Sequence, residues 1–385
     1  MRQLLRGAGM LRFVLSAVLV CVLGFSFPAK PESDPAPEGL AVKAVWITRW
    51  AFKSPEDVKF LFARLADLGV NTVFFQVRGA CDAFYRSSYE PWSDLLTGTL
   101  GRDPGWDPLR LAVREAHKQG LELHAWVNVF TAWQVTESGA PPPVTDPGHI
   151  LLTHPEWIAC DRAREPMPIG KSEARDNYAF LSPTSGGAQR HIKNVINEIV
   201  GKYDVDGVHL DYVRFPDSSY SYDKESRLAY LRATMREEMP FSKWRAQQLT
   251  EFVGALSRSI KKVRPGTMVS AAVWQVIDGG RTSYYQDGVE WMRKGYVDFL
   301  VPMIYTTSAS TFEARLKTYA DSVGASKVVA GIGAYLDDFD AGTLQAELEK
   351  TVEYRARGVC IFNSDYALLY PAVVTDFFSE SPDDE

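Results

Sequence analysis

The stretch VDGVHLDYVRFP, from Val205 to Pro216, has the pattern of a short buried strand that leads directly into a loop. Its residues alternate with the period of two typical of β-structure, so His209 and Asp211 share one face. Seven further runs rich in β-branched or aromatic residues occur along the chain, separated by segments of helical period. The eight predicted strands are 44–48, 72–78, 122–128, 205–211, 268–274, 299–305, 327–332 and 359–363.

The helix after the first strand has the clearest signals. Ser54 and Pro55 supply an N-cap and a first-turn proline, apolar residues recur at spacings of three and four, and Gly69 closes the segment. Further helices are predicted over about 107–119, 187–202, 242–263, 285–294, 311–323 and 342–357, with a last one after Tyr366.

Eight strands that each precede a helix predict a single (β/α)₈ TIM barrel. An open doubly wound sheet would normally carry a glycine-rich phosphate loop after an early strand, and the sequence has no such motif. About 75 residues separate the third and fourth strands, so we expect a long insertion after strand 3, from Thr131 to Ser185, on the active face.

The N-terminus has the charge and hydrophobicity pattern of a signal peptide. Three arginines precede an apolar run from Phe13 to Phe27, which is short for a transmembrane span. An uncleaved membrane anchor is the alternative. Either reading predicts a protein that is secreted, or periplasmic and held in the cell envelope, and that meets a membrane only through this segment.

The chain therefore divides into three parts. Residues 1–27 are the signal peptide or N-terminal anchor, residues 28–40 a Pro-rich linker, and residues 41–378 the barrel domain. Cys21 suggests lipid attachment, but Val20 precedes it where bacterial lipoproteins usually carry a small residue.

Composition excludes several classes of function. With 385 residues, 46% of them hydrophobic and 23% charged, the chain can bury a large core. A net charge of -6 with both signs scattered gives no basic face for nucleic acid. Cys81, Cys160 and Cys360 are an odd set without Cys-x-x-Cys spacing, and the histidines lack zinc-site spacing. We expect no metal and no cofactor, and the oligomeric state stays open.

Asp211 is the leading candidate for a catalytic group, because reacting groups in TIM barrels stand at the C-terminal ends of strands. The alternative is a structural ion pair with Arg214 or Arg78. Glycoside hydrolysis normally needs two carboxylates. Asp82 and Glu90, both in the segment after the second strand, are the candidate partners.

Aromatic residues at strand ends favour a sugar ligand, because the C–H faces of pyranose rings pack on aromatic rings. Asn128 lies in phase with these residues on the third strand, and Arg78 and His209 complete the expected site. The aromatic candidates are Trp46, Trp126, Trp274 and Tyr305.

The chain resembles the glycosyl hydrolase-like 10 family of bacterial envelope proteins over most of residues 41–370. The matching motifs are VWIT (45–48), FQVR (75–78), DAFY (82–85), EPWS (90–93), AH (116–117), HAWVN (124–128), HPEW (154–157), DGVHLDY (206–212) and PMIY (302–305). The resemblance implies a TIM-barrel glycosidase, and some relatives act on peptidoglycan glycan strands stripped of their peptides.

Two departures from the family pattern affect the site. Many relatives have Pro-x-Gly-Asp where this chain reads Gly79-Ala80-Cys81-Asp82, which alters loop rigidity near Asp82. Their second acidic residue directly after Asp211 is also absent, which leaves one fewer candidate partner.

We therefore predict a hydrolase that cleaves O-glycosidic bonds of a polysaccharide or glycan strand, such as peptide-stripped peptidoglycan. Two alternatives stay open: a non-catalytic cell-wall glycan-binding barrel, and a metal-dependent deacetylase of the same polymer. The deacetylase would need metal ligands that these histidines do not assemble.

Overall fold

The computed structural model describes residues 40–135, 139–170 and 178–379. These residues belong to one compact unit. The segments expected as signal peptide or anchor (1–27) and as linker (28–40) lie, apart from Leu40, outside the described residues. In the described ranges, no helix is both long enough and apolar enough to cross a membrane.

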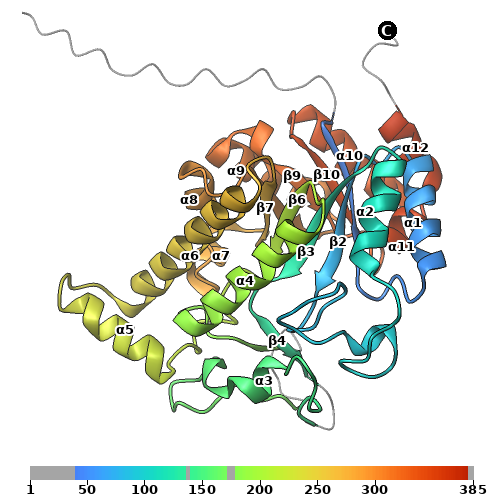
Figure 1. Ribbon diagram of the computed structural model, residues 1–385. Coiled ribbons are helices and arrows are strands. Elements are labelled where there is room, and N and C mark those ends of the chain that lie inside the picture. Colours follow the sequence, from blue (N-terminus) through green and yellow to red (C-terminus); the bar gives the residue numbers. More distant parts are fainter. Residues whose placement is uncertain (1–39, 136–138, 171–177, 380–385) are drawn as a thin grey trace, which may run out of the picture. The chain divides into compact units, whose positions relative to one another are not determined.

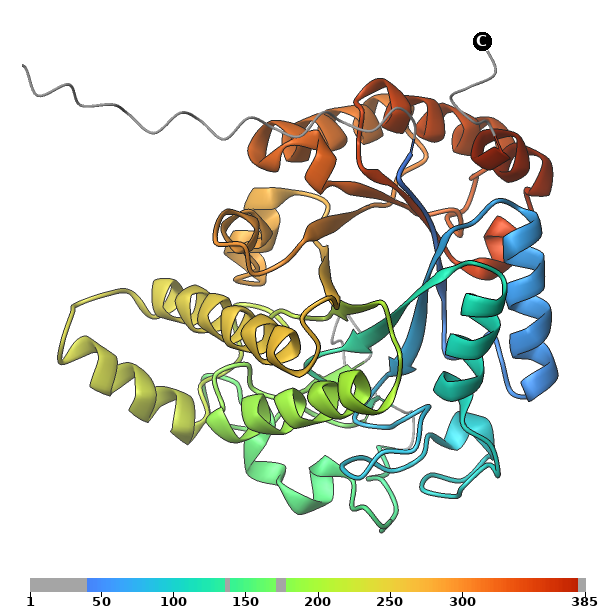
Figure 2. The same ribbon diagram turned by 45° about the horizontal axis from the view of Figure 1, so that its top comes forward.

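Eight parallel strands close into a barrel, in the order β1-β2-β3-β6-β7-β8-β9-β10 (Figure 2). The predicted TIM barrel is confirmed, and each predicted strand matches an observed one to within two residues at either end. The barrel strands are β1 (Val42–Ile47), β2 (Thr72–Arg78), β3 (Glu122–Asn128), β6 (Gly207–Asp211), β7 (Met268–Val273), β8 (Phe299–Ile304), β9 (Val329–Ile332) and β10 (Gly358–Phe362).

Amphipathic helices surround the barrel (Figures 1 and 2). In the first of them, Ser54 Oγ accepts from the Asp57 backbone N–H and the Asp57 side chain accepts from the Ser54 N–H, forming a capping box. The expected helices correspond to α1 (Pro55–Asp67), α2 (Pro108–Lys118), α4 (Gly186–Lys202), α6 (Phe241–Val263), α8 (Gly288–Arg293), α9 (Ala309–Val323), α10 (Ala341–Glu353) and α12 (Pro371–Ser379).

Some boundaries and short elements differ from expectation. The helix expected from 285 begins at Gly288, because Asp287 caps it by accepting from the Glu290 N–H. The helix expected to reach 357 ends at Glu353, just before Arg355 with its positive φ of 50°. The elements not expected are β4 (Thr131–Gln134), α3 (Ile150–Thr153), β5 (Tyr178–Phe180), α5 (Lys224–Thr234), α7 (Ile277–Ser283), α11 (Ser364–Ala367) and the 3₁₀ turns η1 (Asp94–Leu96), η2 (Pro155–Trp157) and η3 (Ala325–Lys327).

Aromatic side chains fill the barrel interior. Trp46, Phe74 and Phe299 pack there in one cluster. His209 stacks on Phe74, with ring centroids 4.1 Å apart and planes 3° apart. The alternation along β6 that places His209 inside also places Asp211 inside, at the C-terminal end of the strand.

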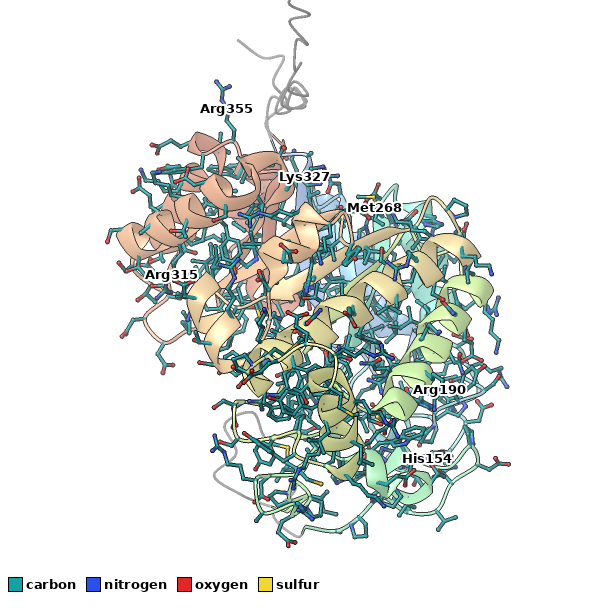
Figure 3. All side chains as sticks on the ribbon, turned by 90° about the vertical axis from the view of Figure 1, so that its left-hand side faces the viewer. His154, Arg190, Met268, Arg315, Lys327 and Arg355 are labelled. Carbon is teal, nitrogen blue, oxygen red and sulfur yellow. The ribbon has the colours of Figure 1, made fainter. Side chains whose placement is uncertain are left out.

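The described residues between the end of β3 and the start of α4 extend from the C-terminal end of the barrel (Figure 1). There β4 and β5 pair as a separate antiparallel sheet. In Figure 3, Met268 at the start of β7 lies toward one end of the molecule and His154, just after α3, lies at the other. These described residues therefore lie toward the strand ends where a TIM barrel carries its site, and the long insertion expected from Thr131 to Ser185 stays a prediction.

Candidate active site

A cavity of about 440 Å³ opens at the C-terminal strand ends, and most of its lining is aromatic. Six predicted site residues line it: Trp46, Trp126, Asn128, Asp211, Trp274 and Tyr305. The structure adds lining residues that the sequence analysis did not assign to the site, namely Trp50, Gln76, Tyr178, Tyr212, Arg214, Gln275, Met303, Tyr335, Leu336 and Phe362.

Asp211 is the last residue of β6 and is 8% exposed. Its Oδ2 accepts from the indole N–H of Trp126 at 3.2 Å, and its Oδ1 accepts from the Tyr212 backbone N–H at 2.6 Å. Tyr212 then adopts a φ of 47°, a conformation that side-chain-bearing residues rarely take. The chain thus turns sharply straight after the carboxylate, which two donors hold in a fixed direction.

Amide and phenol groups supply the polar part of the lining. Gln76 Nε2 donates to Asn128 Oδ1 at 3.2 Å, and Gln76 Oε1 accepts from the Arg49 backbone N–H at 3.0 Å. Burial, together with the negative charge of Asp211, raises the pKa of Tyr305 well above its ordinary value. The Tyr305 hydroxyl therefore keeps its proton and serves as a hydrogen-bond donor.

His209 lies beneath the cavity rather than in its lining. It is fully buried, and its Nε2 accepts from the Trp46 indole N–H at 3.1 Å. Its Nδ1 lies 2.9 Å from Ser270 Oγ. Burial, with a smaller effect from His124, holds the pKa of His209 well below its ordinary value. The neutral ring therefore orients Trp46. The expected contact of His209 with a substrate stays a prediction, and its place outside the cavity lining does not favour it.

Arg78 and Glu90 form a buried ion pair away from this cavity. Arg78 Nη2 lies 2.8 Å from Glu90 Oε1, and Arg78 Nη1 donates to the backbone oxygens of Asn128 and Val129. Burial raises the pKa of Glu90, but Arg78 and His191 outweigh it and lower the pKa to about 2. Neither residue lines the cavity, so the pair holds the end of β3 and Glu90 is not placed to protonate a leaving group there.

Asp82 also lies outside this cavity. Its Oδ1 accepts from the backbone N–H groups of Ala80 at 2.7 Å and Gly79 at 3.2 Å, which fixes the turn after β2. In that turn Cys81 has a φ of 58°, a left-handed conformation that glycine adopts more readily than other residues. Among the described residues that line the cavity, Asp211 is the one carboxylate, so the expected pairing with Asp82 or Glu90 is not supported by their placement.

Arg214 is a positively charged residue of the cavity lining, which the sequence analysis treated only as an alternative ion-pair partner of Asp211. It is 4% exposed, and its guanidinium carbon lies 4.7 Å from the ring centre of Tyr212 and 4.8 Å from that of Tyr284. Its place three residues after Asp211, in the strand-end loop, was the available signal. Tyr178 on β5 had none, because nothing local shows that β5 folds back to β4.

Within the described residues, no group of three or more His, Cys, Asp or Glu side chains could hold a metal ion. The three described cysteines, Cys81, Cys160 and Cys360, are not joined in disulfides.

Known proteins similar to this chain include glycosyl hydrolases. Glycosyl hydrolase YngK of Bacillus subtilis (strain 168) is 28% identical over 322 residues, which cover 76% of this chain and 59% of the relative. Glycosyl hydrolase DigH of Escherichia coli (strain K12) is 30% identical over 294 residues, which cover 70% of this chain and 63% of the relative. The chain thus spans about three fifths of the length of these curated relatives.

Solved structures share the fold at low identity. Alpha-L-fucosidase isoenzyme 2 from Paenibacillus thiaminolyticus has a TM-score of 0.59 and 13% identity, covering 87% of this chain and 48% of that one. The catalytic domain of the beta-amylase from Paenibacillus polymyxa has a TM-score of 0.56 and 12% identity, covering 84% and 92%. At such identities the similarity shows the fold alone. The model of the Glycosyl hydrolase-like 10 family, however, matches residues 41–335, and this chain is therefore a member of that family.

Proposed function

We propose that this protein is a glycoside hydrolase that cleaves O-glycosidic bonds of a polysaccharide, with Asp211 as its central catalytic carboxylate. The observation that carries the proposal is a carboxylate fixed at the end of a barrel strand in a cavity lined mostly by aromatic rings. Aromatic faces bind the C–H faces of sugars, and a fixed carboxylate serves the charged transition state of glycoside cleavage.

Several residues of the cavity lining have distinct roles in the proposed reaction. Trp46, Trp126 and Trp274 hold sugar rings, and Asn128 meets sugar hydroxyl groups. Asp211 either stabilises positive charge at the anomeric carbon or transfers the proton that the bond cleavage requires. Trp126 has a double role, because its ring faces the cavity while its N–H holds the carboxylate.

The proposed substrate is the glycan strand of peptidoglycan after removal of its peptides. The family resemblance supports it, as does the leader expected over residues 1–27, which predicts action outside the cytoplasm or in the cell envelope. Attachment to a membrane through that leader, or through a lipid on Cys21, belongs to the same proposal.

The test is mass spectrometry of products after incubation with intact and peptide-free peptidoglycan strands. Wild-type protein should release glycan fragments, and Asp211→Asn should release none while it still binds the strands and melts at an unchanged temperature. Strand binding without fragments from wild type would instead support a glycan-binding barrel, the alternative that the single described cavity carboxylate favours. Unfolding of Asp211→Asn would make Asp211 a structural residue.

A further inference from the structure

A second cavity, here called the side pocket, lies on the same face of the barrel. It measures about 170 Å³, and its polar lining consists of Arg49, Asp82, Asp94, Trp133 and Gln134. These residues come from the segments that follow β1, β2 and β3, so the side pocket stands over the C-terminal ends of the first three strands.

Arg49 provides unused hydrogen-bond donors in the side pocket. Its side chain is 2% exposed, and its Nη2 donates to Gln134 Oε1 at 2.9 Å and to the Tyr178 hydroxyl at 3.0 Å. Its Nε and Nη1 are buried and have no hydrogen-bond partner among the described residues. The buried indole N–H of Trp133 has none there either. Buried donors in native proteins nearly always have partners, so this lining is complementary to a ligand that accepts hydrogen bonds.

Two carboxylates provide acceptors in the same pocket. Asp82 Oδ1 is occupied by two backbone N–H groups, and Asp94 stands exposed at the rim, at the start of η1. Burial and the nearby charge of Asp82 raise the pKa of Asp94. Within the described residues, no hydrogen bond joins either carboxylate to Arg49, although the Arg49 charge partly opposes the rise in the pKa of Asp94. The donors of Arg49 and Trp133 and the acceptors of Asp82 and Asp94 therefore line the same pocket without hydrogen bonds between them.

This combination identifies the chemistry of the ligand. Hydroxyl and amide groups both donate and accept hydrogen bonds, so an uncharged sugar satisfies a guanidinium, an indole N–H and two carboxylates together. Two carboxylates against one guanidinium disfavour an anionic group. The ring of Trp133 adds a surface of the kind on which sugar C–H groups pack.

The side pocket shares a wall with the active-site cavity. Trp50 and Tyr178 line the cavity, whereas Arg49 and Gln134 line the pocket. The Arg49 guanidinium carbon lies 4.6 Å from the ring centre of Trp50, and Arg49 also binds the Tyr178 hydroxyl. An extended glycan would have to cross only this wall to pass from the cavity to the side pocket.

We propose that the side pocket is a second sugar subsite, which binds one uncharged unit, such as an N-acetylhexosamine, of the glycan whose scissile bond lies at Asp211. The inference rests on the proposed function for the glycan at the cavity, but it concerns binding and can be tested without cleavage. It predicts that affinity rises with glycan length, because a longer chain fills both sites.

The test is calorimetric binding of peptide-free glycan oligomers of two, four and six sugars to the Asp211→Asn protein. Asp94→Ala and Trp133→Phe are added separately to this background, each removing one polar group of the side pocket. The matched control is Asp103→Ala, which removes an exposed carboxylate of the same loop that pairs with Arg86 and lies outside the pocket lining.

We expect the hexamer to bind more tightly than the dimer, and each pocket variant to lose about tenfold in hexamer affinity with less than a twofold change for the dimer. Asp103→Ala should match the parent. Equal affinity for all lengths, or equal losses at every length, would overturn the subsite. If binding depends on glycan length, the pocket variants abolish that dependence and wild type cleaves nothing, the subsite stands. Only the hydrolase proposal is then refuted.

Discussion

Glu347 is a buried acid outside the active site, and it makes the stability of this protein depend on pH. It lies on α10, has no exposed surface, and neither carboxyl oxygen has a hydrogen-bond partner among the described residues. Burial raises the pKa of Glu347 to about 9, from an ordinary value of 4.5. The folded protein therefore holds a proton that the unfolded chain releases at neutral pH.

The sign and size of the effect follow from this difference. Between pH 4.5 and about 9 the folded state binds more protons than the unfolded state, so stability falls as the pH rises through this window. At roughly 1.4 kcal/mol per pH unit, the loss relative to acidic pH is about 3 kcal/mol at pH 7. Glu347→Gln keeps the size of the side chain and removes the titration.

Denaturant unfolding of both proteins from pH 4.5 to 8.5 measures this effect. The two free energies of unfolding should agree to within about 1 kcal/mol at pH 4.5 and then diverge, with the variant more stable by about 3 kcal/mol at pH 7. Glu349→Gln, an exposed change on the same helix, is the control and should follow wild type. Parallel curves for wild type and Glu347→Gln would refute the reasoning.

Three further predictions concern the site and its supports. Trp126→Phe removes the N–H that holds Asp211 and should lower kcat about tenfold or more in a glycan-release assay, with the melting temperature little changed; an unaltered kcat would contradict this positioning role. Glu90→Gln breaks a buried ion pair and should cost about 3–5 kcal/mol of unfolding free energy at pH 7. In wild type the contribution of that pair should be complete above about pH 4.5 and be lost as the pH falls toward 2, so a stability difference that persisted in acid would count against it. Gly79→Ala would place a Cβ 1.5 Å from Arg49 Nη1 and so displace the Arg49 side chain. It should therefore weaken the binding of long glycan oligomers measured by calorimetry. An unchanged affinity would show that Arg49 is not needed for this binding.

Local sequence patterns sufficed for the elements that the barrel needs. Strand alternation and helical periodicity are properties of neighbouring residues, which is why the eight strands were placed to within two residues. The elements missed have weak local signals. β5 has three residues, α7 contains two glycines, and α5 buries only Ser226, so neither length nor amphipathic pattern marked them.

The residues of the active site were likewise predicted only in part. The sequence by itself determined that Asp211 and His209 face the barrel axis and that Trp126 and Asn128 end a neighbouring strand, because parity along a strand decides which way a side chain points. It could not determine what each polar group pairs with. Contact between residues far apart in the chain depends on how the barrel closes and its loops pack.

Only the tertiary structure decided those partners. Glu90 forms ion pairs with Arg78 and His191 and does not lie beside Asp211. The indole N–H of Trp46, on another strand, donates to His209. A buried charge or donor must find a partner wherever packing brings one, because water is not available to replace it. The sequence therefore predicted the strand ends at which the cavity lies and Asp211 as its leading carboxylate. The packing of the loops over the strand ends decided which other groups reach the cavity.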